Sequence, residues 1–176
     1  MKLVNNNIDL IKSCVVSVKD FPIDGILFRD ILPIFQNHLA TEALMMELTL
    51  KCKEFNPICL FALDARGFLF GPVISARLGI PFYPIRKKGK LPGDLVSASY
   101  TKEYGTDTFE TYKVDLKGAR VVILDDLLAT GGSVQCASNL IHQLNGKVVG
   151  YVFAIELQDL KAKDKLAAPV SSVLQY

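Results

Sequence analysis

The chain contains no tryptophan, only four cysteines and only two histidines. No Cys-x-x-Cys pair occurs among Cys14, Cys52, Cys59 and Cys136, which lie far apart in the sequence. This spacing disfavours a structural zinc site, and disulfide scaffolds belong mainly to shorter, secreted chains than one of 176 residues. We therefore expect free thiols in a reducing compartment and a cytoplasmic protein.

Long apolar runs and a strong net charge are also missing. No run approaches the roughly 18 apolar residues that a membrane-spanning helix needs. Polar residues at 5–7 and at Asp9 interrupt any signal-peptide core in the first twenty residues. The formal net charge is only +2, far from that of a chain that coats nucleic acid or a membrane surface. We expect neither as a partner, although a local basic pocket is compatible with this total.

Half of the residues are apolar, which is enough to bury a core. Short apolar runs predict strands at 58–63, 80–85, 121–124 and 147–157. Periodic patterns predict helices at 39–55, at 68–78 and after residue 133, and an amphipathic helix within residues 1–20. Apolar strands separated by helices predict an α/β fold, with a mainly parallel central sheet flanked by helices.

Residues 95–113 differ from the rest of the chain, because they are polar and rich in threonine and tyrosine. Their β propensity favours a hairpin or a long excursion rather than part of the core. Excursions of this length in compact domains often serve as lids or binding loops. Tyr100 fits a lid aromatic and a half-exposed strand residue equally well.

Residues 121–133, VVILDDLLATGGS, carry the most specific chemistry. An apolar strand brings Asp125 and Asp126 to its carboxyl end, where open parallel sheets bind ligands. Small residues then open a helix at Thr130–Ser133, which exposes backbone N–H groups suited to a phosphate. Carboxylates beside a phosphate suit ribose hydroxyls, so the pair of features describes a ribose 5-phosphate. The alternative is an ordinary turn in which an aspartate caps the helix.

This segment resembles the signature of the phosphoribosyltransferases, which use phosphoribosyl pyrophosphate (PRPP). Neither a Walker A motif nor a GxGxxG dinucleotide motif occurs in the chain. Two further segments agree with the resemblance. The turn DARG, Asp64–Gly67, follows a predicted strand, and in the family it binds pyrophosphate and often has a strained peptide, here at Asp64–Ala65. The run RKKGK, Arg86–Lys90, places four cations in five residues, which suits a departing anion.

Other segments are similar to the adenine phosphoribosyltransferases in particular. They are FPIDGILFRDILPIF (21–35), RGFLFGP (66–72), RKKGKLPG (86–93), ASYTKEYG (98–105) and IELQDLKAKDKL (155–166). They occur in the family's order and cover the chain from about residue 21 onward. The resemblance implies one phosphoribosyltransferase domain over 1–176. It also implies a small hood, from about 1–35 and 155–176, and a flexible β-hairpin lid at about 95–113.

The resemblance assigns roles to individual residues. Catalytic roles fall on Glu103, Arg66 and Asp126, with Glu103 near N7 of the base. The ribose and 5′-phosphate of PRPP are assigned to Asp125, Asp126, Ala129, Thr130, Gly131, Gly132 and Ser133. Pyrophosphate is assigned to Asp64, Ala65, Arg66, Arg86, Lys87, Lys90 and Tyr104. Adenine is assigned to Leu27, Phe28, Arg29 and Leu157.

The implied reaction is purine salvage: adenine and PRPP give AMP and pyrophosphate through an oxocarbenium-like transition state. The resemblance also implies Mg²⁺ held mainly by substrate and water, with no protein metal ligand. It implies a homodimer in which Arg86 serves the neighbouring site. Two alternatives stay open. One is a transferase for hypoxanthine, guanine or xanthine, and the other is a PRPP-sensing regulator without catalysis.

Overall fold

The computed structural model describes residues 2–102 and 105–176. The chain forms two compact units, Met1–Glu47 and Leu48–Tyr176. Helix α2 (His38–Glu54) begins in the first unit and ends in the second. In the part of the chain that the structure describes, no helix is long and apolar enough to cross a membrane.

The first unit contains a helix and a two-stranded antiparallel sheet. Its elements are α1 (Lys2–Ser13), β1 (Val16–Lys19), β2 (Leu27–Asp30) and a 3₁₀ helix (Leu32–Gln36). The predicted amphipathic helix is therefore present, with Ile11 buried and Lys12 exposed. The rings of Phe21 and Phe28 meet edge to face at 5.1 Å and pack at the strand-connecting turn.

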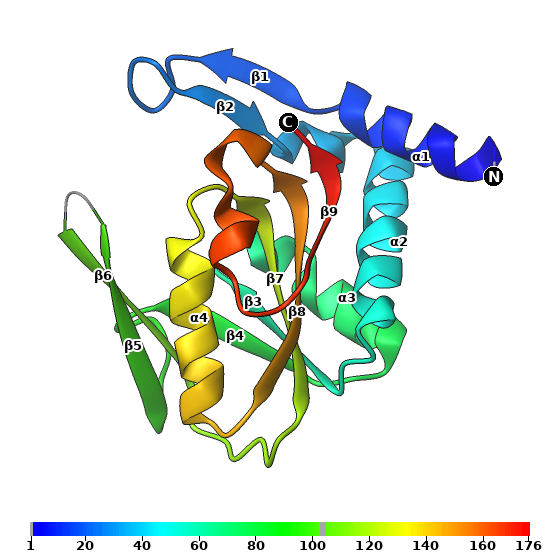
Figure 1. Ribbon diagram of the computed structural model, residues 1–176. Helices are drawn as coiled ribbons and strands as arrows, with labels where there is room; N and C mark the ends of the chain where they lie inside the picture. Colours follow the sequence, from blue (N-terminus) through cyan, green and yellow to red (C-terminus); the bar gives the residue numbers. More distant parts are fainter. Residues whose placement is uncertain (1, 103–104) are drawn as a thin grey trace. The chain divides into compact units, whose positions relative to one another are not determined.

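The second unit is built on a seven-stranded sheet (Figure 1). Its strands are β3 (Cys59–Leu63), β4 (Phe82–Lys87), β5 (Leu95–Lys102), β6 (Gly105–Tyr112), β7 (Arg120–Leu128), β8 (Lys147–Glu156) and β9 (Val170–Gln175). They lie in the order β5-β6-β4-β3-β7-β8-β9. The five strands from β4 to β9 pair in parallel, which confirms the predicted parallel sheet, while β6 runs antiparallel to β4 and β5.

Helices cover both faces of this sheet. Helix α4 (Gly132–Gln143) packs on the face that carries Phe61, Ile123 and Phe153. Its buried side follows the predicted pattern, Val134, Ala137, Leu140 and Ile141, with Leu144 just beyond the helix. Helix α3 (Gly71–Leu78) lies on the opposite face, where Gly71 approaches Ala62 (Figure 1). The remaining 3₁₀ helices are Arg66–Leu69, Gln158–Leu160 and Ala162–Lys165.

Two local expectations are wrong. The helix expected over 68–78 is a 3₁₀ helix followed by α3, which begins only at Gly71. Pro72 in the first turn has no N–H to donate backward, so it favours a helix start at this point. The hairpin of β5 and β6 is present, but its base belongs to the core, because β6 pairs with β4 and Ala98 and Phe109 are buried.

All four cysteines are free thiols, as the sequence predicts. Cys52, Cys59 and Cys136 are buried, and Cys14 is partly exposed. Burial raises the pKa of the Cys52 thiol to about 12 and that of Cys59 to about 11. These thiols stay protonated near neutral pH and act as core side chains.

Candidate active site

Four parallel strands bring the predicted site residues of the second unit to one edge of the sheet. Strands β3, β4, β7 and β8 run in the same direction, so their carboxyl ends meet there. Asp64 follows β3, Arg86 lies near the end of β4, Asp125 lies near the end of β7, and Leu157 follows β8. Segments nearly a hundred residues apart in the sequence thereby form one surface.

The acidic pair at the end of β7 is held by its own backbone and by Arg66. The backbone N–H of Asp126 donates to Oδ1 of Asp125 at 2.9 Å. Nε of Arg66 lies 2.8 Å from Oδ2 of Asp126. Arg66 comes from the turn after β3, so this ion pair joins the two central strands of the sheet at their ends.

Burial dominates the electrostatics of this pair. It raises the pKa of Asp125 well above the usual value, and the neighbouring charge of Asp126 raises it further. The pKa of Asp126 is also raised by burial, while the Arg66 guanidinium opposes that shift. The charge of Arg66 favours the ionised form of both carboxyl groups, in which their oxygens are acceptors only. Hydroxyl groups of a sugar are neutral donors that satisfy such acceptors without adding charge.

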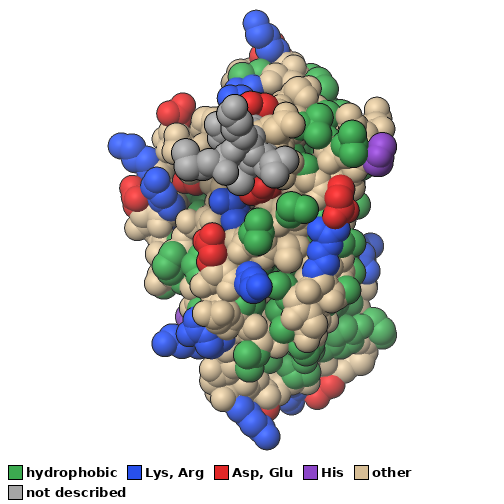
Figure 2. Space-filling model, turned by 90° about the vertical axis from the view of Figure 1, so that its right-hand side faces the viewer, with side chains coloured by type: hydrophobic (Ala, Val, Ile, Leu, Met, Phe, Trp, Pro, Cys, Tyr) green, Lys and Arg blue, Asp and Glu red, His purple; other side chains and the backbone are tan. Residues whose placement is uncertain are grey.

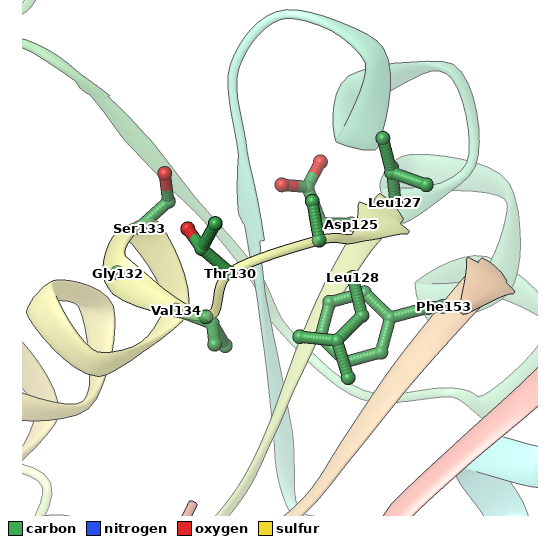
Figure 3. Close-up of a pocket in the computed structure, with 10 residues that line it drawn as sticks. Asp125, Leu127, Leu128, Thr130, Gly132, Ser133, Val134 and Phe153 are labelled. Carbon is green, nitrogen blue, oxygen red and sulfur yellow. The ribbon is translucent and has the colours of Figure 1, made fainter. Parts of the chain in front are cut away.

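The connection from β7 to α4 forms a small pocket of about 80 Å³. It is lined by Asp125, Leu127, Leu128, Ala129, Thr130, Gly131, Gly132, Ser133, Val134 and Phe153. Figure 3 shows the Thr130 and Ser133 hydroxyls and the Asp125 carboxylate on one side of this connection. The side chains of Leu128 and Val134 point to the opposite side, into the core. The pocket therefore has a polar mouth on an apolar floor.

Backbone N–H groups at the start of α4 complete the pocket. The residue that caps this helix is Gly131, which makes no side-chain cap hydrogen bond. The alternative in which an aspartate caps the helix is thus wrong. Gly131 has a φ of 88°, a conformation that glycine adopts without a steric cost. The first N–H groups of an α-helix have no partner within the helix, and with the helix dipole behind them they suit an anion such as phosphate.

Tyr100 of β5 touches this loop, a contact that sequence reasoning did not identify. Its hydroxyl lies 2.8 Å from Oγ of Ser133. Its ring lies against Gly132, where an added Cβ would approach it to 3.1 Å. The sequence feature that could have predicted this contact is the two-residue period of a β-strand, which places Tyr100 on the same face as buried Ala98.

The turn after β3 carries the first group of predicted pyrophosphate contacts. The Asp64–Ala65 peptide bond is cis. It is the bond at which the family resemblance predicts a strained peptide. Oδ2 of Asp64 accepts a hydrogen bond from Nε of Arg86 at 3.2 Å. The Arg86 guanidinium also stands 5.9 Å above the ring of Phe68. These contacts join the turn to the end of β4.

The basic segment Arg86–Lys90 is shaped by bonds to its backbone. Arg86 donates to the carbonyl of Lys90 at 3.0 Å, which closes the segment on itself. Buried Glu110 of β6 accepts from the N–H of Gly89 at 2.8 Å. Nζ of Lys87 lies 3.9 Å from Asp107, at the edge of ion-pair distance. The cations are consequently gathered on an ordered turn rather than on a free surface loop.

The residues assigned to adenine divide between the two units. Leu27, Phe28 and Arg29 lie in β2 of the first unit, where Arg29 donates to the hydroxyl of Ser17. Leu157 belongs to the second unit, and its N–H donates to the carbonyl of Leu128 at 3.0 Å. Their joint role stays a prediction. Glu103 and Tyr104, assigned to the base and the leaving group, lie outside the described residues.

Comparison with known proteins agrees with this geometry. The family model described as "Phosphoribosyl transferase domain" matches residues 34–174. The adenine phosphoribosyltransferase of Yarrowia lipolytica is 43% identical over 169 residues, which cover 93% of each chain. That of Cytophaga hutchinsonii is 44% identical over 170 residues, 94% of each chain.

Solved structures show the same likeness in three dimensions. Adenine phosphoribosyltransferase from Saccharomyces cerevisiae superposes with a TM-score of 0.91 and 41% identity, covering 96% of this chain and 99% of that one. That structure holds adenine and an imino-altritol bisphosphate. The enzyme from Rhodothermus marinus gives a TM-score of 0.89 and 35% identity, covering 98% and 99%.

Proposed function

Because the chain belongs to the adenine phosphoribosyltransferases, we propose that it transfers the 5-phosphoribosyl group of PRPP to adenine, giving AMP and pyrophosphate. The single observation that carries this proposal is the acidic pair beside the phosphate-sized pocket at the end of β7. A site for a phosphate next to a site for two neighbouring hydroxyl groups fits a ribose 5-phosphate. The reaction belongs to purine salvage.

The described residues act first on the ribose 5-phosphate. The loop Ala129–Ser133 and the start of α4 bind the 5′-phosphate through N–H and hydroxyl donors. Asp125 and Asp126 accept from the ribose hydroxyls and fix the sugar. Their negative charge also stabilises the cationic character that C1 acquires as the leaving group departs.

The leaving pyrophosphate would meet the cations of two turns. Arg66 lies in the turn after β3, Lys87 is the last residue of β4, and Lys90 lies in the turn that follows it. Ordered cations stabilise a departing anion without reorganising during the reaction. Water at C1 would consume PRPP, and a lid at about 95–113 that excludes it is part of the proposal.

Mg²⁺ is the cofactor that this chemistry implies. The described residues include no group of three His, Cys, Asp or Glu side chains that could hold a metal. Mg²⁺ keeps several waters and binds readily to phosphate oxygens, so substrate and water would supply its ligands without a protein metal ligand. Bound with PRPP, Mg²⁺ would neutralise part of the pyrophosphate charge.

Recognition of adenine would use Leu27, Phe28 and Arg29 from the first unit and Leu157 from the second. Backbone groups at 27 and 29 would meet the polar edge of the base, and Phe28 and Leu157 would pack on the ring. Glu103 would manage the proton that adenine loses when N9 attacks C1. Support for these roles is the match of each residue to the family's motif.

We also propose a homodimer in the cytoplasm. Leu69 and Val73 are each 40% exposed, close to Arg66 in the sequence, and such apolar side chains fit a protein contact. Figure 2 shows hydrophobic side chains at the surface of one face, interspersed with charged ones. Four free thiols favour a reducing compartment such as the cytoplasm.

A pyrophosphate-release assay tests the proposed reaction. The protein is incubated with PRPP, Mg²⁺ and one base at a time: adenine, hypoxanthine, guanine or xanthine. We expect release with adenine alone. Release only with another base would support the rival transferases, and PRPP binding without release from any base would support the regulator. Either result would reject the proposed function.

A further inference from the structure

The Tyr100 hydroxyl lies between two acceptors in the half of the hairpin nearer its turn. It is 2.8 Å from Oγ of Ser133, where either oxygen can donate, and 3.4 Å from Oδ2 of Asp107. Asp107 in turn lies 3.9 Å from Nζ of Lys87. These side chains link the 5′-phosphate loop to the basic segment across β5 and β6.

The ring of Tyr100 is held in place independently of its hydroxyl. It stacks on Phe109 with centroids 5.7 Å apart and planes 15° apart. The edge of the ring also packs against Gly132, so closely that a Cβ added there would lie 3.1 Å from it. The phenol oxygen is therefore presented to Ser133 from a rigid support, with little rotational freedom to lose on binding.

A phenol carries one hydrogen, so Tyr100 cannot donate to Ser133 and Asp107 at once. If Tyr100 donates to Asp107, the Ser133 hydrogen turns toward the phenol oxygen, and a lone pair faces the loop. If Tyr100 donates to Ser133, the Ser133 hydrogen is free to point into the loop. Only the second arrangement offers an anion a hydroxyl donor at Ser133.

We propose that Tyr100 is a positioning residue for the 5′-phosphate: its hydroxyl donates to Ser133 and turns the Ser133 hydrogen toward the phosphate. Asp107 competes for the same phenol hydrogen and so opposes this arrangement, while Lys87 reduces the competition by pairing with Asp107. The inference rests on the proposed function, since it takes the ligand of the loop to be the phosphate of a ribose 5-phosphate.

Binding of ribose 5-phosphate, measured by calorimetry, tests the inference directly. Tyr100→Phe keeps the ring and its stacking and removes only the hydroxyl, so it should raise the Kd about fivefold to tenfold. Ser99→Ala is the matched control, because it removes the hydroxyl bond to Thr108 in the same hairpin, 2.8 Å long and exposed, away from the loop. It should leave the Kd within about twofold.

Asp107→Asn supplies a prediction of opposite sign. Loss of the carboxylate charge weakens the competing acceptor, so the Kd for ribose 5-phosphate should fall about threefold. In the Tyr100→Phe background the same substitution should change nothing, because the shared hydrogen is gone. An equal effect of Asp107→Asn in both backgrounds would show that it acts through its charge alone and would overturn the coupling.

Steady-state kinetics separate positioning from a structural role. Tyr100→Phe should raise KM for PRPP and leave kcat and KM for adenine within about twofold. The inference is overturned if Tyr100→Phe leaves the Kd for ribose 5-phosphate unchanged, or if Ser99→Ala raises it equally. In either case the unsubstituted chain would still release pyrophosphate, so the proposed function would stand. If the unsubstituted chain bound no ribose 5-phosphate and released no pyrophosphate, the proposed function would fail, and the inference with it.

Discussion

Nε of Arg66 lies 2.8 Å from Oδ2 of Asp126, and the Asp126 side chain is only 8% exposed. The pair connects the turn that is assigned to pyrophosphate with the carboxylates that are assigned to ribose. The guanidinium partly offsets the negative charge of the buried carboxyl groups. Loss of either partner should therefore affect binding and stability together.

Arg66→Ala should lower kcat/KM for PRPP by at least about 100-fold. It should also lower the free energy of unfolding by roughly 1–3 kcal/mol, because a buried carboxylate loses its cation. Asp126→Asn should lower activity similarly without unfolding the protein. Lys113→Ala, which breaks the exposed pair with Asp94, is the control and should change neither quantity measurably. Near-normal turnover of folded Arg66→Ala would remove Arg66 from the site.

Asp125→Asn should stabilise the ligand-free protein in a pH-dependent way. Burial raises the folded-state pKa of Asp125 above its unfolded value. Between those two values the folded state binds more protons, so the free energy of unfolding falls as pH rises through that window. The asparagine variant lacks this loss, and its Tm should exceed that of the unsubstituted chain by a few degrees at pH 7.

Thermal unfolding at two pH values checks this prediction. At about pH 3, below the unfolded-state pKa, Asp125 is protonated in both the folded and the unfolded state, and the Tm difference should vanish. The same variant should lose activity, since the amide adds a donor where ribose hydroxyls need acceptors. A Tm difference of equal size at both pH values would show that ionisation of Asp125 is not its cause.

Gly131→Ala tests the phosphate loop against a matched helix-end glycine. Gly131 has a φ of 88°, and Gly79 at the end of α3 has a φ of 66° with open space around it. Alanine at either position should cost about 1–2 kcal/mol in stability. Only Gly131→Ala should weaken the binding of ribose 5-phosphate, raising its Kd about tenfold, because the substitution reorients the first N–H groups of α4. Equal affinities in the two variants would place the phosphate elsewhere.

Mixed dimers test the assignment of Arg86 to the neighbouring site. Arg86 bonds to Asp64 of its own chain, so a role in its own site competes with the proposed one. Arg86→Ala and Asp126→Asn should each be nearly inactive. If Arg86 acts across the dimer, random mixing of the two should restore about a quarter of the unsubstituted activity, because half of the dimers regain one complete site.

The control for this experiment is each variant mixed with itself. If Arg86 serves its own chain, the mixture should show no recovery, since every chain then carries a defect in its own site. Light scattering on the same samples should give twice the mass of one chain. A fully active monomer would exclude the dimer proposal.

Much of the fold was predictable because it rests on local patterns. The apolar runs at 58–63 and 121–124 became β3 and β7, and the motif ending in Gly131 and Gly132 correctly placed the start of α4. Parallel pairing then brings Asp64, Arg86 and Asp125 to one edge by topology alone. The hairpin was predicted as well, but its attachment to the core was missed, because Thr- and Tyr-rich strands show little apolar periodicity.

The sequence by itself determined the four core strands β3, β4, β7 and β8 and the chemistry available near their carboxyl ends, since strand and helix formation follow from side-chain periodicity within a few residues of chain. It did not give the exact strand ends, because β7 continues through Asp125 and Asp126 to Leu128. Only the tertiary structure decided which polar groups meet there. The Arg66–Asp126 pair spans 60 residues and the Tyr100–Ser133 bond spans 33. Such contacts depend on strand register and ring packing, and a shift of one residue would turn the strand residues Asp126 and Tyr100 to the other face of the sheet.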